Sequence, residues 1–146
     1  MVTKLILKTR ELPEFFGAVF GAIQAKSDKA FQNLISFIVS FYQDNLFNPH
    51  WGEQIRFYSG NIIHLNMLFQ GLNKEQATEV WKPFVSWVNS HPADFEWTES
   101  FAVAALPAQH LWDPDFLNKY ASSLIAKDDR PNASKENIFW KGDGDE

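Results

Sequence analysis

The sequence contains no cysteine among its 146 residues. This absence excludes disulfide bonds, catalysis by a thiolate and zinc sites built on cysteine. Long apolar runs are missing too: none approaches the ~20 residues that cross a bilayer, and Met1–Arg10 lacks the apolar core of a secretory signal, so we expect a cytoplasmic chain. Positive charge is scarce, and the net charge of −5 argues against nucleic acid or an anionic membrane as partners.

Aromatic residues are abundant by contrast, at 16% of the chain. They exceed the needs of a minimal core, so we expect part of the aromatic surface to belong to an interface or a ligand site. The proportions of apolar and charged residues are those of a globular protein, and the length suits one domain. We place an α+β domain at residues 1–126 and expect the polar residues 127–146 to form a loose tail.

The N-terminal segments predict a strand followed by a helix. Val2–Arg10 is rich in Thr, Leu and Ile, a composition that favours a strand. Pro13 fits the first turn of a helix, which we place at Glu14–Gln24. Gly17 and Gly21 share one face of this helix, and we expect a close backbone contact there.

Two further helices have recognisable beginnings. One is capped by Ser27 or the residue after it and runs to about Leu46, on a stripe of apolar residues at three- and four-residue steps. The other begins at Asn73, with Gln76 at the spacing of a capping box. Pro83 lies inside this second pattern and predicts a kink or a break.

A β-hairpin is predicted between these two helices. Its strands are Glu53–Tyr58 and Ile62–Gln70, and the turn residues are Ser59–Asn61. A two-residue loop would pair an apolar face with a polar one, whereas a three-residue loop keeps the core on one side. The three-residue loop sets two pairs of opposite residues, Phe57 with Ile63 and Arg56 with His64.

The remaining elements complete an α+β pattern. Phe95–Leu106 predicts a last strand, and Asp113 with Pro114 predicts the cap and first turn of a helix to about Leu124. This order favours a ferredoxin-like split βαβ fold, an antiparallel sheet with helices on one face and one inserted helix. The other face must meet solvent, a second copy or another domain.

One polar cluster on that open sheet face is a candidate site. Polar residues there are ordinary for a solvent-facing antiparallel sheet. If the face instead closes over a small-molecule substrate, Arg56 suits a carboxylate or phenolate, and His64 or Tyr58 suits proton exchange. The predicted substrate-binding residues are Gln54, Arg56, Tyr58, His64 and Asn66.

Other signatures of chemistry are missing from the sequence. No two of the four histidines stand four residues apart, so we expect no metal site. There is no glycine-rich phosphate loop and no serine in a Gly-x-Ser-x-Gly turn. Glu96 and Glu99 would point to opposite faces of a strand and do not form a catalytic pair. No catalytic residue is assigned.

Several segments resemble the substrate-domain region of FAD-linked oxidases of the berberine-bridge-enzyme-like branch. They are strings of aromatic residues, glycine and proline rather than catalytic signatures. The resemblance is carried by Leu5–Thr9, Glu11–Gly17, Phe47–Gln54, Phe69–Leu72, Trp81–Phe84 and Asn137–Trp140.

This resemblance implies the substrate-binding domain of a flavoenzyme that oxidises an alcohol, sugar or amine by hydride transfer to FAD. The flavin would be bound mainly by a separate FAD-binding domain that contacts the open sheet face, so we expect this chain alone to be inactive. Two alternatives stay open. The chain is a dimeric ferredoxin-like ligand-binding module, or it is a small acid–base enzyme of the dimeric α+β barrel kind that uses His64 and Arg56.

Overall fold

The computed structural model describes residues 4, 6–7, 9–52, 54–122, 125–134 and 137–140. The chain forms two compact units, Met1–Leu106 and Pro107–Glu146. We describe each unit by itself. None of the helices in the described ranges is long and apolar enough to cross a membrane.

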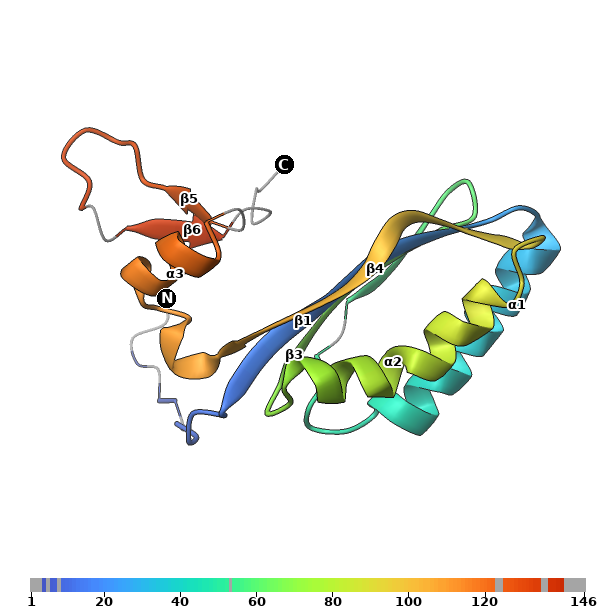
Figure 1. Cartoon of the computed structure of the whole chain (residues 1–146), viewed down its shortest axis with the longest axis horizontal. Helices are drawn as coiled ribbons and strands as arrows, with labels where there is room; N and C mark the ends of the chain where they lie inside the picture. Colours follow the sequence, from blue (N-terminus) through green and yellow to red (C-terminus); the bar gives the residue numbers. More distant parts are fainter. Residues whose placement is uncertain are drawn as a thin grey trace. The chain divides into compact units, whose positions relative to one another are not determined.

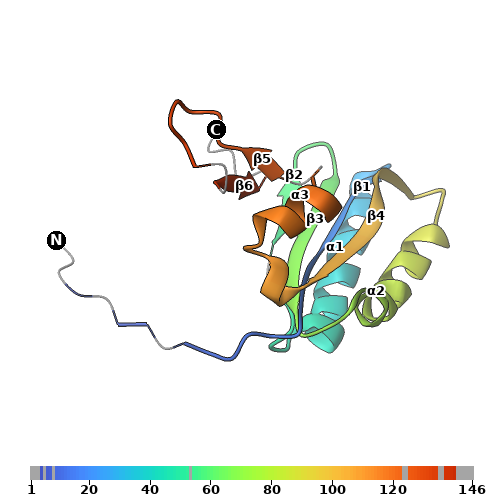
Figure 2. The ribbon, with the colours of Figure 1, turned by 60° about the vertical axis from the view of Figure 1, so that its left-hand side comes forward.

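The first unit is built on a four-stranded antiparallel sheet with the strand order β2-β3-β1-β4. The helices α1 and α2 lie side by side on one face of this sheet (Figures 1 and 2). This connectivity is the ferredoxin-like arrangement, so the predicted fold class is confirmed. In chain order the elements are β1 (Phe15–Ala25), α1 (Asp28–Phe41), the π-helical turn η1 (Tyr42–Leu46), β2 (Ile55–Tyr58), β3 (Ile62–Gln70), α2 (Lys74–Asn89) and β4 (Phe95–Pro107).

The core lies between the sheet and the two helices. It is rich in aromatic rings: Phe37 stacks on Trp87 with their centroids 4.0 Å apart, and Trp81 contacts Phe41 at 5.2 Å. Burying a large ring stabilises a fold more than burying any other side chain. Much of the aromatic content therefore serves this core, which also includes Val19, Ile23, Leu34, Ile38, Leu46, Ile63, Met67, Phe69, Phe84 and Val88.

Both helix starts lie where the sequence placed them. The Ser27 hydroxyl accepts the N–H of Ala30 at 3.1 Å and caps α1. Asn73 and Gln76 form a reciprocal capping box at the start of α2. Pro83 lies within α2, which continues as one helix across it, so the helix does not break there.

The hairpin between β2 and β3 confirms the predicted register. Phe57 lies opposite Ile63, and Arg56 lies opposite His64. Gly60 has a φ of 81° and Asn61 a φ of 62°, the left-handed conformation that a three-residue loop requires.

The helix predicted at Glu14–Gln24 is wrong, because this segment is the central strand β1. Phe15–Ile23 is a continuous apolar run, which suits a strand buried between two neighbours. A Cβ on Gly17 would lie 2.2 Å from Cζ of Phe69 and 2.4 Å from the carbonyl oxygen of Ala104. The predicted close backbone contact exists, but it joins strands and not helices.

The strand predicted at Val2–Arg10 is also wrong for the part of it that the structure describes. Lys4, Ile6, Leu7, Thr9 and Arg10 carry no strand; the other positions lie outside the described residues. A strand needs a hydrogen-bonded neighbour, and composition alone does not supply one.

In its described residues, the second unit contains two short helices and a small two-stranded sheet. Asp113 caps α3, with Pro114 in its first turn as predicted, but α3 ends at Tyr120 rather than near Leu124. Strand β5 pairs with β6 in antiparallel fashion. The boundary that we placed at residue 126 stays a prediction. The elements are η2 (Ala108–His110), α3 (Pro114–Tyr120), β5 (Ile125–Lys127) and β6 (Ile138–Trp140).

Candidate functional site

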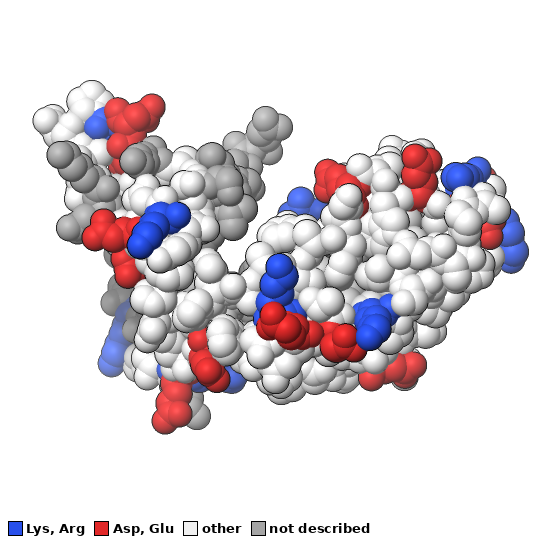
Figure 3. All heavy atoms as spheres, in the orientation of Figure 1, with Lys and Arg blue, Asp and Glu red and all other residues white. Residues whose placement is uncertain are grey.

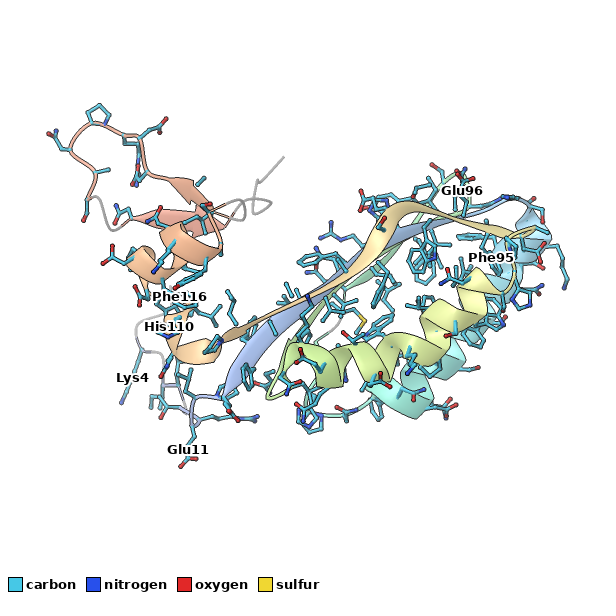
Figure 4. The ribbon with its side chains drawn as sticks, in the orientation of Figure 1. Lys4, Glu11, Phe95, Glu96, His110 and Phe116 are labelled. Atoms are coloured by element: carbon cyan, nitrogen blue, oxygen red, sulfur yellow. The ribbon has the colours of Figure 1, made fainter. Side chains whose placement is uncertain are left out.

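The candidate site is the sheet face opposite α1 and α2, called the open face below. Alternation along the strands assigns residues to it: the row that crosses Arg56, His64 and Ala22 lies on the side away from the core. Figure 4 shows the same alternation at the start of β4, where Phe95 points toward the helices and Glu96 points away.

All five residues predicted for the site lie along β2 and β3 on this face. Arg56 and Tyr58 are on β2, and His64 and Asn66 are on β3. Gln54 precedes β2, and its carbonyl oxygen accepts the N–H of Asn66 at 3.0 Å. That they bind a substrate stays a prediction.

Large apolar side chains share the open face. Phe20, Tyr58 and Leu68 are 37%, 45% and 48% exposed. Phe20 on β1 pairs with Asn66, so a ring lies directly beside the polar cluster. Exposed apolar residues grouped on one face are more typical of a covered surface than of a permanently hydrated one.

The polar cluster has one cation and one aromatic contact at its centre. The rings of Tyr58 and His64 meet edge to face, with centroids 4.8 Å apart. Arg56 donates from Nη2 to Oε1 of Gln54 at 3.3 Å. Within the described ranges no carboxylate forms an ion pair with Arg56. Its remaining N–H donors therefore suit an anionic group on a ligand.

On the helical side of the unit, the surface charges over α2 are mixed in sign. In Figure 3, Lys and Arg lie among Asp and Glu over α2 and do not form a continuous patch of one sign. One such pair is Lys82 with Glu79, at 3.1 Å on the exposed face of α2. Exposed pairs of this kind contribute little free energy and select no ligand.

The second unit holds a histidine–aspartate pair. His110 Nδ1 lies 3.3 Å from Asp113 Oδ2, and the His110 ring stacks on Phe116 with centroids 4.1 Å apart (Figure 4). The N–H of Phe116, followed by His110 and the N–H of Asp115, lowers the pKa of Asp113. These bonds are those of a helix cap, so the pair holds the start of α3.

A second charged group in this unit closes the loop between β5 and β6. The Arg130 guanidinium donates to both carboxylate oxygens of Asp128, at 2.8 and 2.6 Å, and Asn137 adds a bond of 3.0 Å. Arg130, then Asn137, holds the pKa of Asp128 far below its usual range. The adjoining hollow of about 330 Å³ is lined by these three residues and by Pro131, Asn132, Ala133 and Ser134. Because Arg130 and Asn137 already satisfy the carboxylate, this group fixes the loop and leaves no free charge for a ligand.

Metal ligands are not grouped anywhere in the described part of the chain. Two histidines outside the open face make local bonds to backbone oxygens: Nδ1 of His50 lies 2.9 Å from the oxygen of Gln70, and Nδ1 of His91 lies 2.8 Å from that of Trp87. Each holds a loop at the end of a strand or helix.

Comparison with known proteins gives few matches. No protein-family model and no curated protein matches this chain. A solved structure described as an antibiotic biosynthesis monooxygenase from Nitrosomonas europaea matches with a TM-score of 0.43 and 6% identity, covering 70% of this chain and 98% of that chain. A likeness this distant says nothing about activity, and the fold rests on the strand order given above.

The resemblance to FAD-linked oxidases is wrong. No family model matches the chain, of flavoenzymes or of any other class, and the solved structure named above is described as a monooxygenase and not as an oxidase substrate domain. The function inferred from it, a substrate-binding cap for a flavin domain, is withdrawn with it. The expectation of FAD depended on the same resemblance and has no other support. Its motifs were short strings of aromatics, glycine and proline, which also arise where rings pack in a core.

The sequence missed the contribution of β1 to the site. Phe20 lies on the open face next to Asn66, and Ala22, on the same side opposite His64, is only 1% exposed. Because this segment was predicted as a helix, neither residue was included in the predicted site. Phe15–Ile23 is apolar throughout, and periodicity alone does not distinguish a buried strand from a buried helix in such a run.

Proposed function

We propose that this chain is a ferredoxin-like ligand-binding module that works as a dimer, in which the open faces of two copies pack together around a small molecule. The observation that carries the proposal is the mixture on this face of exposed Phe20, Tyr58 and Leu68 with the cation of Arg56. Such a mixture suits a surface that is covered yet retains polar contacts for a ligand.

A second copy is the simplest cover for a sheet face of this kind. Two sheets pack about 10 Å apart when their inner side chains interdigitate. In a twofold dimer each copy presents the same patch, so two sets of Arg56 and His64 would line the space between the sheets. The lining of the space between the two sheets would be apolar beside Phe20 and Leu68 and polar beside β2.

The polar residues define the class of ligand. Arg56 suits a carboxylate, phenolate or enolate, and the side chains of His64 and Asn66 can orient it by hydrogen bonds. Tyr58 and Phe20 offer ring surfaces to a flat apolar body. We therefore assign the site to small molecules that combine a flat apolar part with one anionic group.

Leu68→Arg tests the dimer. In a twofold interface this change introduces two charges into an apolar contact, and burying unpaired charge is costly. We expect the dissociation constant, measured by sedimentation equilibrium, to rise at least about 100-fold, which corresponds to roughly 2.7 kcal/mol.

The matched control is Val39→Arg, on the exposed side of α1. It adds the same charge away from the open face and is expected to leave the dissociation constant unchanged. A wild-type chain that stays monomeric at high concentration, or a Leu68→Arg variant that dimerises normally, would refute the proposal.

A second candidate function is acid–base catalysis on the same face. It is favoured by the contact of Tyr58 with His64 and by the position of Arg56 directly opposite His64. An imidazole can exchange a proton near neutral pH while a guanidinium stabilises the resulting anion.

For this candidate we expect the chain to accelerate deuterium exchange at the acidic C–H of acetoacetate, followed by NMR in deuterated water. His64→Ala should lower the rate at least about 100-fold, because general acid–base catalysis contributes about that much or more. His110→Ala, in the second unit, is the control and should retain the rate. Equal rates in wild type and His64→Ala, with circular dichroism showing both folded, exclude this candidate.

A further inference from the structure

The described residues before β1 form an extended arm with exposed apolar side chains. Ile6 and Leu7 are 79% and 74% exposed, and Leu12 is exposed as well. These residues carry no helix or strand, and in Figure 2 the described parts of the chain before β1 run out from that strand without folding back. The sequence of this arm favours a strand, yet a strand without a partner is not stable in water. The arm therefore has the composition of a strand and lacks a neighbour.

The edge strand β4 has an outer side to which a further strand could be added. It is the last strand of the sheet and is bonded there only to β1. No charged residue occurs from Phe101 to Leu106. Across the described ranges no loop supplies backbone bonds to Glu96–Leu106. Long apolar edges are normally blocked by charge, proline or a covering segment, because they template strand addition.

We infer that the arm of one copy pairs with the outer edge of β4 in a second copy. This contact is made by the backbone at the edge of β4 and does not involve the residues proposed to hold the ligand, although Ala102 itself projects from the open face, since Val103 beside it lies in the core. An antiparallel pairing that sets Leu7 opposite Ala102 also sets Arg10 opposite Glu99. All four residues are exposed, and opposite charges across a pair of strands stabilise it. Backbone hydrogen bonds would provide the affinity, as in other cases of strand addition.

The arm cannot reach the edge of its own sheet in this register. Gly17 lies beside Ala104, so the start of β1 is next to the end of β4. If Arg10 lay opposite Glu99 of the same chain, the chain would have to return from there to Phe15 near Leu106. The distance along β4 is roughly 23 Å, whereas the chain from Arg10 to Phe15 spans roughly 18 Å at most. A second copy has no such limit.

The absence of cysteine makes a cross-linking test straightforward. One copy carries Leu7→Cys and a first affinity tag, and the other carries Ala102→Cys and a second tag. The two are mixed and treated with a short bis-maleimide. We expect a cross-linked pair that carries both tags, at least 10-fold above a control in which Val39→Cys replaces Ala102→Cys. Adding Ile6→Pro to the arm removes a backbone donor and should reduce this product strongly.

Two results overturn the inference. The first is a yield no higher than that of the Val39→Cys control. The second is a link that forms only within single chains, tested with both cysteines on one chain diluted into an excess of cysteine-free protein. If either result is obtained with a protein that still sediments as a dimer, the arm pairing is refuted and the proposed open-face dimer is not. The open-face dimer is refuted by a different observation, a Leu68→Arg variant that sediments like the wild type.

Discussion

Replacing Gly17 with alanine is expected to lower the free energy of unfolding by about 3 kcal/mol or more, at the upper end of the cost of overpacking a core. The added Cβ would lie 2.2 Å from the ring of Phe69 and 2.4 Å from the carbonyl oxygen of Ala104. The ring is 1% exposed and packs against Trp51, with centroids 5.2 Å apart, so it has no free space to enter. The backbone of β4 would have to move, and with it the central pairing of the sheet.

Urea unfolding followed by circular dichroism measures this loss, and the midpoint of thermal unfolding should fall by roughly 10 °C or more. Gly52→Ala is the matched control, because its Cβ would lie 3.7 Å from the oxygen of Leu68, an ordinary contact. It should change the free energy by less than about 0.5 kcal/mol. If Gly17→Ala is as stable as Gly52→Ala, then β1 does not approach Phe69 as described.

Replacing Trp81 with alanine is expected to cost about 3–5 kcal/mol, the usual range for a large buried ring. Trp81 is fully buried at the centre of the core. Its indole Nε1 has no hydrogen-bond partner among the described residues. It is surrounded by the rings of Phe41, Trp51, Phe84 and Phe101, with centroids between 5.2 and 6.1 Å away.

Trp81→Phe separates the contribution of the buried ring from the cost of the buried indole N–H. It keeps one ring in the cluster and removes an N–H that is buried without a partner, which itself costs free energy. We expect it to be at least about 1.5 kcal/mol more stable than Trp81→Ala in the same urea experiment. Trp112→Ala is the control, since Trp112 is largely exposed and should contribute little. A cost for Trp81→Ala as small as that for Trp112→Ala would mean that the ring does not lie in the core.

The hairpin could be predicted from the sequence because its constraints are local. Loop length and the alternation of Phe57 and Ile63 with Arg56 and His64 admitted one register, and the structure has it. The helix caps at Ser27 and Asn73 were predictable for the same reason, since a cap depends on bonds within three residues.

The strand β1 could not be predicted in this way, because the reason for its conformation lies elsewhere in the chain. Pro13, which fits the first turn of a helix, favoured a helix locally. Gly17 instead accommodates the ring of Phe69 and the backbone of β4. Residues from three strands meet at that point, and no window of sequence contains all three. Tertiary packing overrides local propensity in such central strands.

The sequence by itself determined the alternation that places Arg56, Tyr58, His64 and Asn66 on one side of a hairpin, because a strand turns successive side chains to opposite faces. Only the tertiary structure decided that β1 lies beside that hairpin and brings Phe20 to the same face, because pairing between distant strands depends on the packing of the whole sheet. The arm before β1 shows the same difference between what the local sequence determines and what the tertiary structure decides. Its sequence gives it strand character, and whether it forms a strand depends on a neighbour that its own sheet does not supply.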